Sequence, residues 1–302
     1  MIILVLTLAD LIIAVIIARK FSLIAGLLFF LNPISIIITG YHNQFDNIAI
    51  LGALTAILYL DSGDSSSKSR NVYVGLTLIG FSLAVKQILL FFPIWLFYRN
   101  GTFKQRFIRS AIPYVVYTAC FVPWATSISR IEIIFEEVFL QRRGRSGILL
   151  NLFGADYAGT IHGSSYSDLI RKVVFASWVL GILVFGWIFR NRSLIHSLII
   201  YLLIMVGLAP AYSQQQLILP LLAVFLYATV ELKIFYLLTL LFMIQNSDEL
   251  GFEFFLPHFF RLNGTVYAWL QVLLIIFSLR FVFPKLFRKA RSDNLQTALK
   301  LD

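Results

Sequence analysis

Charged residues and cysteine are both scarce in this sequence. Charged residues occupy 13% of the 302 positions, whereas soluble domains average about 25%. The single cysteine, Cys120, excludes an internal disulfide, and no Cys/His spacing typical of a structural metal site occurs. Phosphate-binding glycine loops and nucleophile elbows are also missing from the sequence. These absences exclude the enzyme classes that depend on those motifs.

Hydrophobic residues, by contrast, make up 59% of the chain, and the mean hydropathy is +0.85. A membrane-spanning helix needs about 20 predominantly apolar residues, and runs approaching this length recur along the sequence. We expect an all-α, polytopic transmembrane helical bundle that forms a single domain over residues 1–302, with about 11 spans, some short or broken. The expected helices are 2–18, 21–39, 47–60, 72–86, 88–98, 111–128, 169–189, 194–210, 215–229, 233–246 and 264–283.

The net charge of +10 is explained by membrane topology rather than by a nucleic-acid partner. Basic residues lie in short clusters between apolar runs, as they do in the cytoplasmic loops of membrane proteins. We therefore predict an integral, multi-pass membrane protein with a basic cytoplasmic tail over residues 284–302, and no nucleic acid among its partners. The other clusters are Arg19–Lys20, Lys68/Arg70, Arg99 to Arg109, Arg190/Arg192 and Lys233.

The apolar stretch over residues 72–98 contains Lys86 and Gln87 in its middle. If one helix crossed the membrane here, the basic cluster after the stretch would lie opposite the basic cluster before it. If the stretch turns back at Lys86, all the basic clusters fall on one face, which agrees with the positive-inside rule. We therefore predict a helix break at Lys86–Gln87, near the non-cytoplasmic face, where protein or water surrounds the irregular backbone.

A polar cluster in NPISIIITGYHNQFD, residues 32–46, separates two apolar segments. His42, Gln44 and Asp46 lie there, where an ionisable side chain must face water, a cavity or a partner. These groups suit a polyhydroxyl or phosphorylated ligand. The competing interpretation is an N-cap, in which Asp46 binds the first amides of the following helix. We expect Lys86 to meet an anion such as Asp46 or a ligand phosphate, unless it snorkels to the membrane interface.

The longest external segment, residues 129–168, combines an amphipathic stretch with a group of arginines. Apolar residues recur with helical spacing over residues 131–139, which predicts a helix lying in the membrane interface. Arg142, Arg143 and Arg145 follow. Their guanidinium forks suit a phosphate or pyrophosphate, and contact with lipid headgroups explains them equally well.

Two further polar sites interrupt apolar runs. Tyr212 and Gln214 in PAYSQQQLILP follow Pro210 at the outer end of a predicted helix, where a third polar rim and a simple turn both fit the pattern. Asp10 lies within the first apolar segment, and we expect a polar partner for it inside the bundle. The candidate substrate-binding residues are His42, Gln44, Asp46, Lys86, Gln87, Arg142, Arg143, Arg145, Tyr212 and Gln214.

Three of these motifs resemble segments of the GT-C superfamily of integral-membrane glycosyltransferases. NPISIIITGYHNQFDN is similar to the Asn-Pro to Gln-Phe/Tyr-Asp/Asn motif of dolichyl-phosphate-glucose glucosyltransferases and of bacterial mannosyl- and glucosyltransferases that use polyprenyl-phosphate sugars. FSLAVKQILLFFPIWLFY resembles their Lys-Gln segment, and YSQQQLILP resembles their late polar turn. The resemblance spans residues 1–230, and the first two motifs together are fairly specific.

The resemblance implies transfer of a hexose from a polyprenyl-phosphate donor to a lipid-linked or protein acceptor on the non-cytoplasmic face. It favours a bacterial plasma membrane over the endoplasmic reticulum and implies no cofactor; a divalent metal is compatible with it but not required. Two alternatives stay open, which are a transporter or flippase for lipid-linked saccharides and an inactive membrane subunit.

The general base of the family is an aspartate in the first external loop, just after the first helix. This chain instead opens in a helix that descends to Arg19–Lys20. We therefore expect the family's first helix and that loop to be missing, as in a truncated reading frame or a fragment. The resemblance assigns the base to no residue of this chain.

Overall fold

The computed structural model describes residues 2–41, 45–63, 69–127, 130, 145–146, 165–212, 214–245 and 266–282. Within these ranges the chain forms α1 (Ile2–Lys20), α2 (Leu23–Phe30), α3 (Pro33–Ser35), α4 (Asp46–Gly63), α5 (Ser69–Val85), α6 (Phe92–Tyr98), α7 (Phe103–Phe121), α10 (Ser165–Ile188), α11 (Leu194–Gly207), α12 (Leu221–Tyr227), α13 (Val230–Gln245) and α14 (Val266–Val282). The predicted all-α bundle is thereby confirmed.

Shorter elements connect these helices. One π-helical turn, η1 (Ile36–Tyr41), and three 3-10 turns, η2 (Gln87–Leu89), η3 (Val122–Trp124) and η5 (Gln214–Ile218), lie among the described residues. Two-residue strands, β1 (Arg145–Ser146) and β2 (Ala211–Tyr212), pair in antiparallel fashion. The predicted amphipathic helix at 131–139 and the tail at 284–302 lie outside the described residues.

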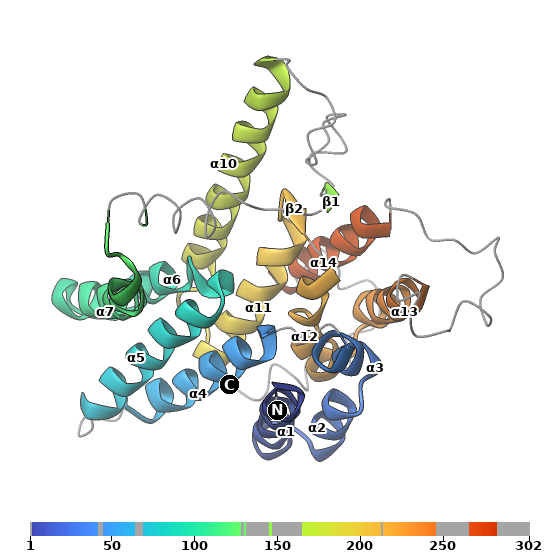
Figure 1. The fold of residues 1–302 in the computed structure, drawn as a ribbon, viewed down its shortest axis with the longest axis horizontal. Coiled ribbons are helices and arrows are strands. Elements are labelled where there is room, and N and C mark those ends of the chain that lie inside the picture. Colours follow the sequence, from blue (N-terminus) through green and yellow to red (C-terminus); the bar gives the residue numbers. More distant parts are fainter. Residues whose placement is uncertain are drawn as a thin grey trace.

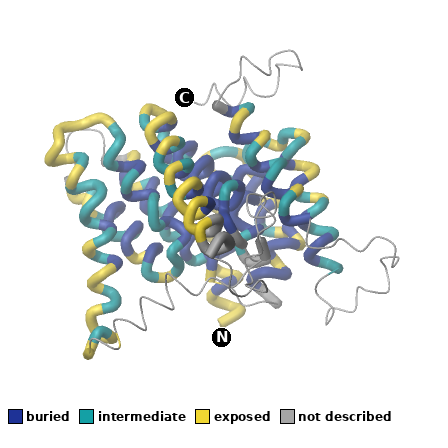
Figure 2. The backbone as a smooth tube through the Cα atoms, turned by 90° about the horizontal axis from the view of Figure 1, so that it is seen from above, coloured by how far each residue is buried: buried dark blue, intermediate teal, exposed yellow. Residues whose placement is uncertain are grey.

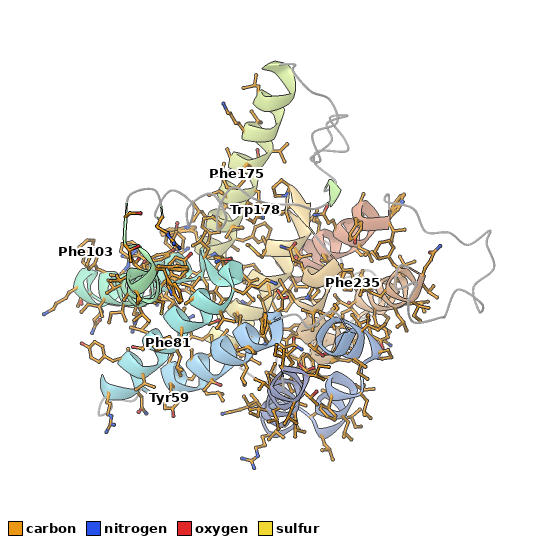
Figure 3. The ribbon with its side chains drawn as sticks, viewed as in Figure 1. Tyr59, Phe81, Phe103, Phe175, Trp178 and Phe235 are labelled. Atoms are coloured by element: carbon orange, nitrogen blue, oxygen red, sulfur yellow. The ribbon has the colours of Figure 1, made fainter. Side chains whose placement is uncertain are left out.

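Helix α11 forms the centre of the bundle, with α10, α12 and α14 beside it (Figure 1). Apolar residues lie around its whole circumference, which is typical of a helix buried on all sides, and Leu198 to Leu203 are at most 1% exposed. Trp178 from α10, labelled in Figure 3, donates its Nε1–H to the Met205 carbonyl at 3.3 Å. From α14, the Gln271 amide donates to two carbonyls at the end of α11. Polar side chains therefore orient the neighbours of an apolar core helix.

Helices α4 and α5 form a tightly packed hairpin because small residues lie at their contact. A Cβ atom on Gly52 would approach the Ser82 side chain to 3.1 Å, and one on Gly75 would approach the Ala56 carbonyl to 2.8 Å. The Ser82 hydroxyl also donates to the Ala49 carbonyl at 2.7 Å. This close approach brings the start of α4 beside the end of α5.

Four predicted helices differ from those observed. The expected helices 88–98 and 215–229 are each divided into a 3-10 turn and a shorter helix, η2 with α6 and η5 with α12. The expected helix 21–39 is interrupted at Leu31–Asn32, because Pro33 begins a new turn and the Asn32 side chain accepts the Ile34 amide hydrogen at 3.0 Å. The expected helix 111–128 instead begins at Phe103 and ends at Phe121. Its early start follows from a capping box, in which Thr102 and Gln105 exchange side-chain to backbone hydrogen bonds.

Large apolar side chains lie on the outside of the bundle as well as in its core, and Figure 2 shows exposed positions around a buried centre. On α1 the exposed fractions run from 40% for Val15 to 63% for Leu4, and on α2 they reach 68% for Ile24. Contiguous exposed apolar surface of this kind is rare on soluble monomers.

By length and composition, α1 is the only described helix that meets a criterion for crossing a membrane alone, and seven apolar helical stretches of 10–17 residues fall short of it. A core helix or a signal sequence meets the same criterion. The polytopic membrane arrangement therefore stays a prediction.

Candidate functional site

The candidate site is built where α4 begins and α5 ends. Asp46 is the first residue of α4, and Lys86 follows the last residue of α5. The Lys86 Nζ atom lies 2.8 Å from Asp46 Oδ2, and the two side chains are 28% and 0% exposed. The pairing expected for the lysine is therefore present, and it joins positions 40 residues apart.

The predicted break at Lys86–Gln87 is confirmed. Lys86 has extended backbone, with φ −155° and ψ 133°, and the half-buried Gln87 opens the short turn η2. Val72 on α5 and Arg99 just after α6 line one pocket at the far end of α4, which shows that the chain returns after the break. The stretch is a helix, a turn and a returning half-helix rather than one rod.

Two tyrosines fix the irregular backbone after the break. The Tyr201 hydroxyl, from the core helix α11, accepts the Phe91 amide hydrogen at 3.1 Å and donates to the Ile88 carbonyl at 2.9 Å. The Tyr114 hydroxyl, from α7, donates to the Leu90 carbonyl at 2.6 Å. Backbone groups that leave a helix inside an apolar bundle need such partners. The tyrosines therefore stabilise the turn that carries Lys86.

A second buried carboxylate lies next to the ion pair. Asp10 is 6% exposed, and its Oδ2 accepts hydrogen bonds from Ser35 at 3.1 Å and Thr39 at 3.0 Å. Its Oδ1 accepts a hydrogen bond from the side-chain amide of Asn47, the neighbour of Asp46. The expected internal pairing of Asp10 is thus confirmed, and it ties α1, α3 and η1 to the first turn of α4.

The Asp46 carboxylate keeps one acceptor for a further partner. Its Oδ1 is buried, and no donor within the described part of the chain reaches it. The N-cap interpretation is not supported, because Asp46 lies inside the helix and its other oxygen binds Lys86. A buried acceptor without a donor costs about 1–3 kcal/mol. Asp46 Oδ1 is therefore a costly buried acceptor, in contrast to Oδ2, which binds Lys86.

The polar segment with Tyr212 and Gln214 also lies near this end of α4. The backbone of Arg145 in β1 pairs in register with that of Tyr212 in β2. Gln214 opens η5, and η5 contacts both η1 and α4. The structure thus brings the backbones of these three residues toward the beginning of α4, while their side chains lie outside what it describes.

Four predicted site residues, His42, Gln44, Arg142 and Arg143, lie outside the described residues. Sequence reasoning also missed Asn47 and Tyr201. The signal for Tyr201 is a phenol hydroxyl in the middle of the apolar run of α11, which must find hydrogen-bond partners when buried. Within the described ranges, no group of three or more His, Cys, Asp and Glu side chains is placed to hold a metal ion.

Comparisons with known proteins leave this geometry as the main guide to function. No family model matches the chain, and neither a curated protein nor a solved structure matches it.

Proposed function

We propose that this chain is a multi-pass integral membrane glycosyltransferase of the GT-C type. It moves a hexose from a polyprenyl-phosphate donor to a lipid-linked or protein acceptor on the non-cytoplasmic face. A bacterial plasma membrane is the preferred location. The three motif resemblances support the activity, and the apolar exterior of α1 and α2 supports the membrane.

The observation that carries the proposal is the ion pair between Asp46 and Lys86 at a helix break. Burying a charge is expensive unless it is paired, and a pair contributes little net stability compared with apolar packing. A buried ion pair on a fixed, irregular turn is therefore better explained by a functional role than by a contribution to the stability of the fold. Membrane-embedded ionisable residues commonly bind substrates or ions.

The proposed reaction is a direct displacement at the anomeric carbon. The acceptor hydroxyl oxygen forms a bond to that carbon, while the bond from the carbon to the donor phosphate oxygen breaks. The hydroxyl proton passes to a general base, and the polyprenyl phosphate leaves with the bonding electron pair. We assign the general base to no residue of this chain.

The residues of the site take complementary parts in this reaction. Lys86, together with Arg142, Arg143 and Arg145, neutralises the donor phosphate, whose negative charge grows as the bond to the sugar breaks. Asp46, which is fully buried, holds the lysine through Oδ2 and so positions its ammonium group for the phosphate.

The remaining candidates line the same site in this proposal. His42, Gln44 and Gln87 position the sugar and the phosphate by hydrogen bonds. Tyr212 and Gln214 form the far rim. The described residues require no metal for this arrangement.

Binding of the donor by the full chain tests the proposal without depending on the general base. Polyprenyl-phosphate hexose is titrated into the purified protein in nanodiscs, for the native chain, Lys86→Ala and Lys104→Ala. Lys104 is an exposed lysine on α7, outside the site, and controls for loss of one charge. We expect Lys86→Ala to weaken binding about tenfold, because it removes one charge-assisted hydrogen bond, and Lys104→Ala to bind normally. Equal affinity of Lys86→Ala and the native chain would remove Lys86 from the site.

A flippase for lipid-linked saccharides is the second candidate, and one observation favours it. Among the described residues, apolar helices are broken at Leu31–Asn32 and at Lys86, and transporters often bind substrates between such half-helices. Transbilayer movement of a fluorescent polyprenyl-linked saccharide in proteoliposomes, without release of the sugar, identifies this activity. Transfer of the hexose to an added acceptor identifies the enzyme.

A further inference from the structure

Aromatic rings from three helices form a continuous chain of contacts at the end of the bundle where α6 ends and α7 begins. Trp187 of α10 contacts Tyr98 of α6, with the ring centroids 5.8 Å apart. Phe97, whose ring centroid lies 6.4 Å from that of Tyr98, contacts Phe103 of α7 at 6.2 Å. Phe103 then stacks on Phe107 at 6.4 Å. We call these residues the aromatic ribbon.

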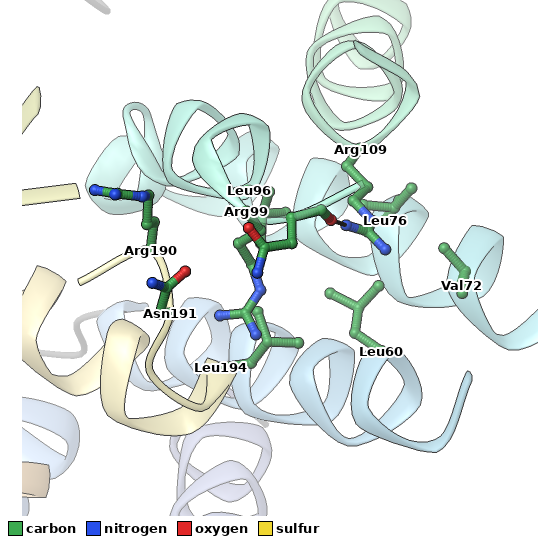
Figure 4. A pocket seen from close by; sticks show the side chains of 10 residues that line it. Leu60, Val72, Leu76, Leu96, Arg99, Arg109, Arg190, Asn191 and Leu194 are labelled. Atoms are coloured by element: carbon green, nitrogen blue, oxygen red, sulfur yellow. Dashed lines mark hydrogen bonds between the residues drawn. The ribbon is translucent and has the colours of Figure 1, made fainter. Parts of the chain in front are cut away.

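Basic residues lie at the same end of the bundle as the aromatic ribbon. A pocket of about 210 Å³ at this end is lined by Arg99, which follows α6, by Arg109 of α7 and by Arg190, from the turn after α10 (Figure 4). The ends of α6 and α10 and the first turns of α7 therefore lie together. Basic side chains next to aromatic rings are typical of the interface between a membrane and water.

Three rings of the aromatic ribbon are open to the surroundings of the protein. Phe103 is 73% exposed, Phe107 is 57% exposed and Trp187 is 52% exposed. An aromatic side chain stabilises a fold mainly through the apolar surface that it buries, and packing within the chain buries less than half of each of these residues. The ribbon is therefore an exposed apolar surface, and large surfaces of this kind mark sites of interaction.

The exposed phenylalanines belong to a regular helix rather than to a loop. The capping box of Thr102 and Gln105 closes the start of α7, so the chain is already helical at Phe103. Residues four apart lie on one side of a helix, and the rings of Phe103 and Phe107 stack with 21° between their planes. The first two turns of α7 therefore present both rings as one surface.

Two arginines lie over rings of the aromatic ribbon. The Cζ atom of Arg106 is 4.7 Å from the ring centroid of Phe97, and that of Arg190 is 4.0 Å from the ring centroid of Trp187. Each guanidinium also donates to the backbone carbonyl of the same aromatic residue, at 2.7 Å and 2.9 Å. A cation is attracted to the face of an aromatic ring, and the planar edge of a guanidinium matches the oxygens of a phosphate. The ribbon thus combines apolar rings with cations that the structure holds in place.

We propose that the aromatic ribbon is a lipid-binding surface that lies at the boundary between the headgroups and the acyl chains of the cytoplasmic leaflet. Phe103, Phe107 and Trp187 insert among the upper parts of the acyl chains, while Arg106 and Arg190 contact lipid phosphates. This inference rests on the membrane location proposed above, but not on glycosyl transfer. A partner protein is the competing occupant of the same surface.

The fluorescence of Trp187 in the full chain tests the proposal. The protein is reconstituted in vesicles of phosphatidylcholine and phosphatidylglycerol that contain lipids brominated either near the headgroup or near the end of the acyl chain. The contribution of Trp187 is the difference between the native chain and Trp187→Phe. We expect bromine near the headgroup to quench this contribution more strongly than bromine near the chain end. The reverse order, or no quenching by either lipid, overturns the proposal.

Nitroxide labels measure the position of the phenylalanines in the same vesicles. Phe103→Cys and Phe107→Cys are labelled in a Cys120→Ser background, and Lys104→Cys, at an exposed position on the same turn of α7, is the matched control. We expect labels at positions 103 and 107 to collide more often with dissolved oxygen, which concentrates in lipid, than with a water-soluble nickel chelate. The label at position 104 should show the opposite preference. Equal preferences at all three positions contradict the proposal.

A label on α2 separates failure of this proposal from failure of the membrane location. Ile24 is 68% exposed on a different part of the bundle, and a nitroxide on Ile24→Cys reports whether the apolar exterior faces lipid. If that label lies in lipid while those at positions 103 and 107 lie in water, only the aromatic ribbon is assigned wrongly, and a partner protein replaces lipid as its occupant. If all three labels lie in water, both proposals are wrong.

Discussion

The buried carboxylates of Asp10 and Asp46 each have hydrogen-bond or ion-pair partners in the described structure. Asp10, Asp46 and Lys86 were predictable as paired groups, because a charge in an apolar segment has few alternatives. Which residues would be their partners was harder to predict from the sequence. Asn47 is an ordinary polar residue at a helix start, and only the fold brings its amide to Asp10, 37 positions away.

The contribution of the ion pair between Asp46 and Lys86 to stability can be tested by single and double mutation. Removing Lys86 leaves the buried Asp46 carboxylate without its cation, so Lys86→Met should destabilise the protein by about 3–5 kcal/mol. Asp46→Asn should cost less, because the lysine that stays behind is 28% exposed and reaches water. The double variant should be destabilised by less than the sum of the two. Thermal unfolding in one detergent, measured for all four proteins, gives the coupling. Purely additive losses would show that the two side chains do not interact in the folded state.

The bounds of a helix are predictable where its apolar run ends at charged or polar residues. The helices at 2–18, 47–60, 72–86 and 169–189 were predicted close to their observed bounds. The interruption at Leu31–Asn32 was missed because the apolar run continues through Pro33 without a change in hydropathy. The early start of α7 was missed because its first turn is basic, and the capping box at Thr102 outweighs hydropathy there.

The role of Tyr201 in the turn after Lys86 can be tested by mutation. Tyr201→Phe removes a hydroxyl that serves both Ile88 and Phe91, so two buried backbone groups lose their partner. We expect a loss of about 1–3 kcal/mol in thermal unfolding and weaker binding of the donor, because the turn also positions Lys86. Tyr73→Phe on α5 is the control, since Tyr73 is 50% exposed. A Tyr201→Phe protein as stable as the control would mean that the turn holds its shape without the hydroxyl.

The whole molecule has two chemically different ends. One gathers Asp46, Lys86 and the Asp10 cluster, and the other gathers Arg99, Arg109 and Arg190, from two turns and α7, around a pocket. Charge clusters in the sequence predicted that these arginines share a face, because cytoplasmic loops are enriched in Arg and Lys. The pocket itself was not predictable, since its walls come from positions as distant as Val72 and Arg190.

The central claim is that the chain turns back at Lys86, so that residues on both sides of residues 72–98 share one face of a membrane. Cysteine labelling in intact cells tests it most directly, with single cysteines at Arg70, Lys104 and Phe45 in a Cys120→Ser background. These three positions are exposed in the structure. With a membrane-impermeant maleimide, we expect labelling of Phe45→Cys in intact cells, and labelling of Arg70→Cys and Lys104→Cys only after permeabilisation. Labelling of Arg70→Cys and Lys104→Cys from opposite sides would contradict the account.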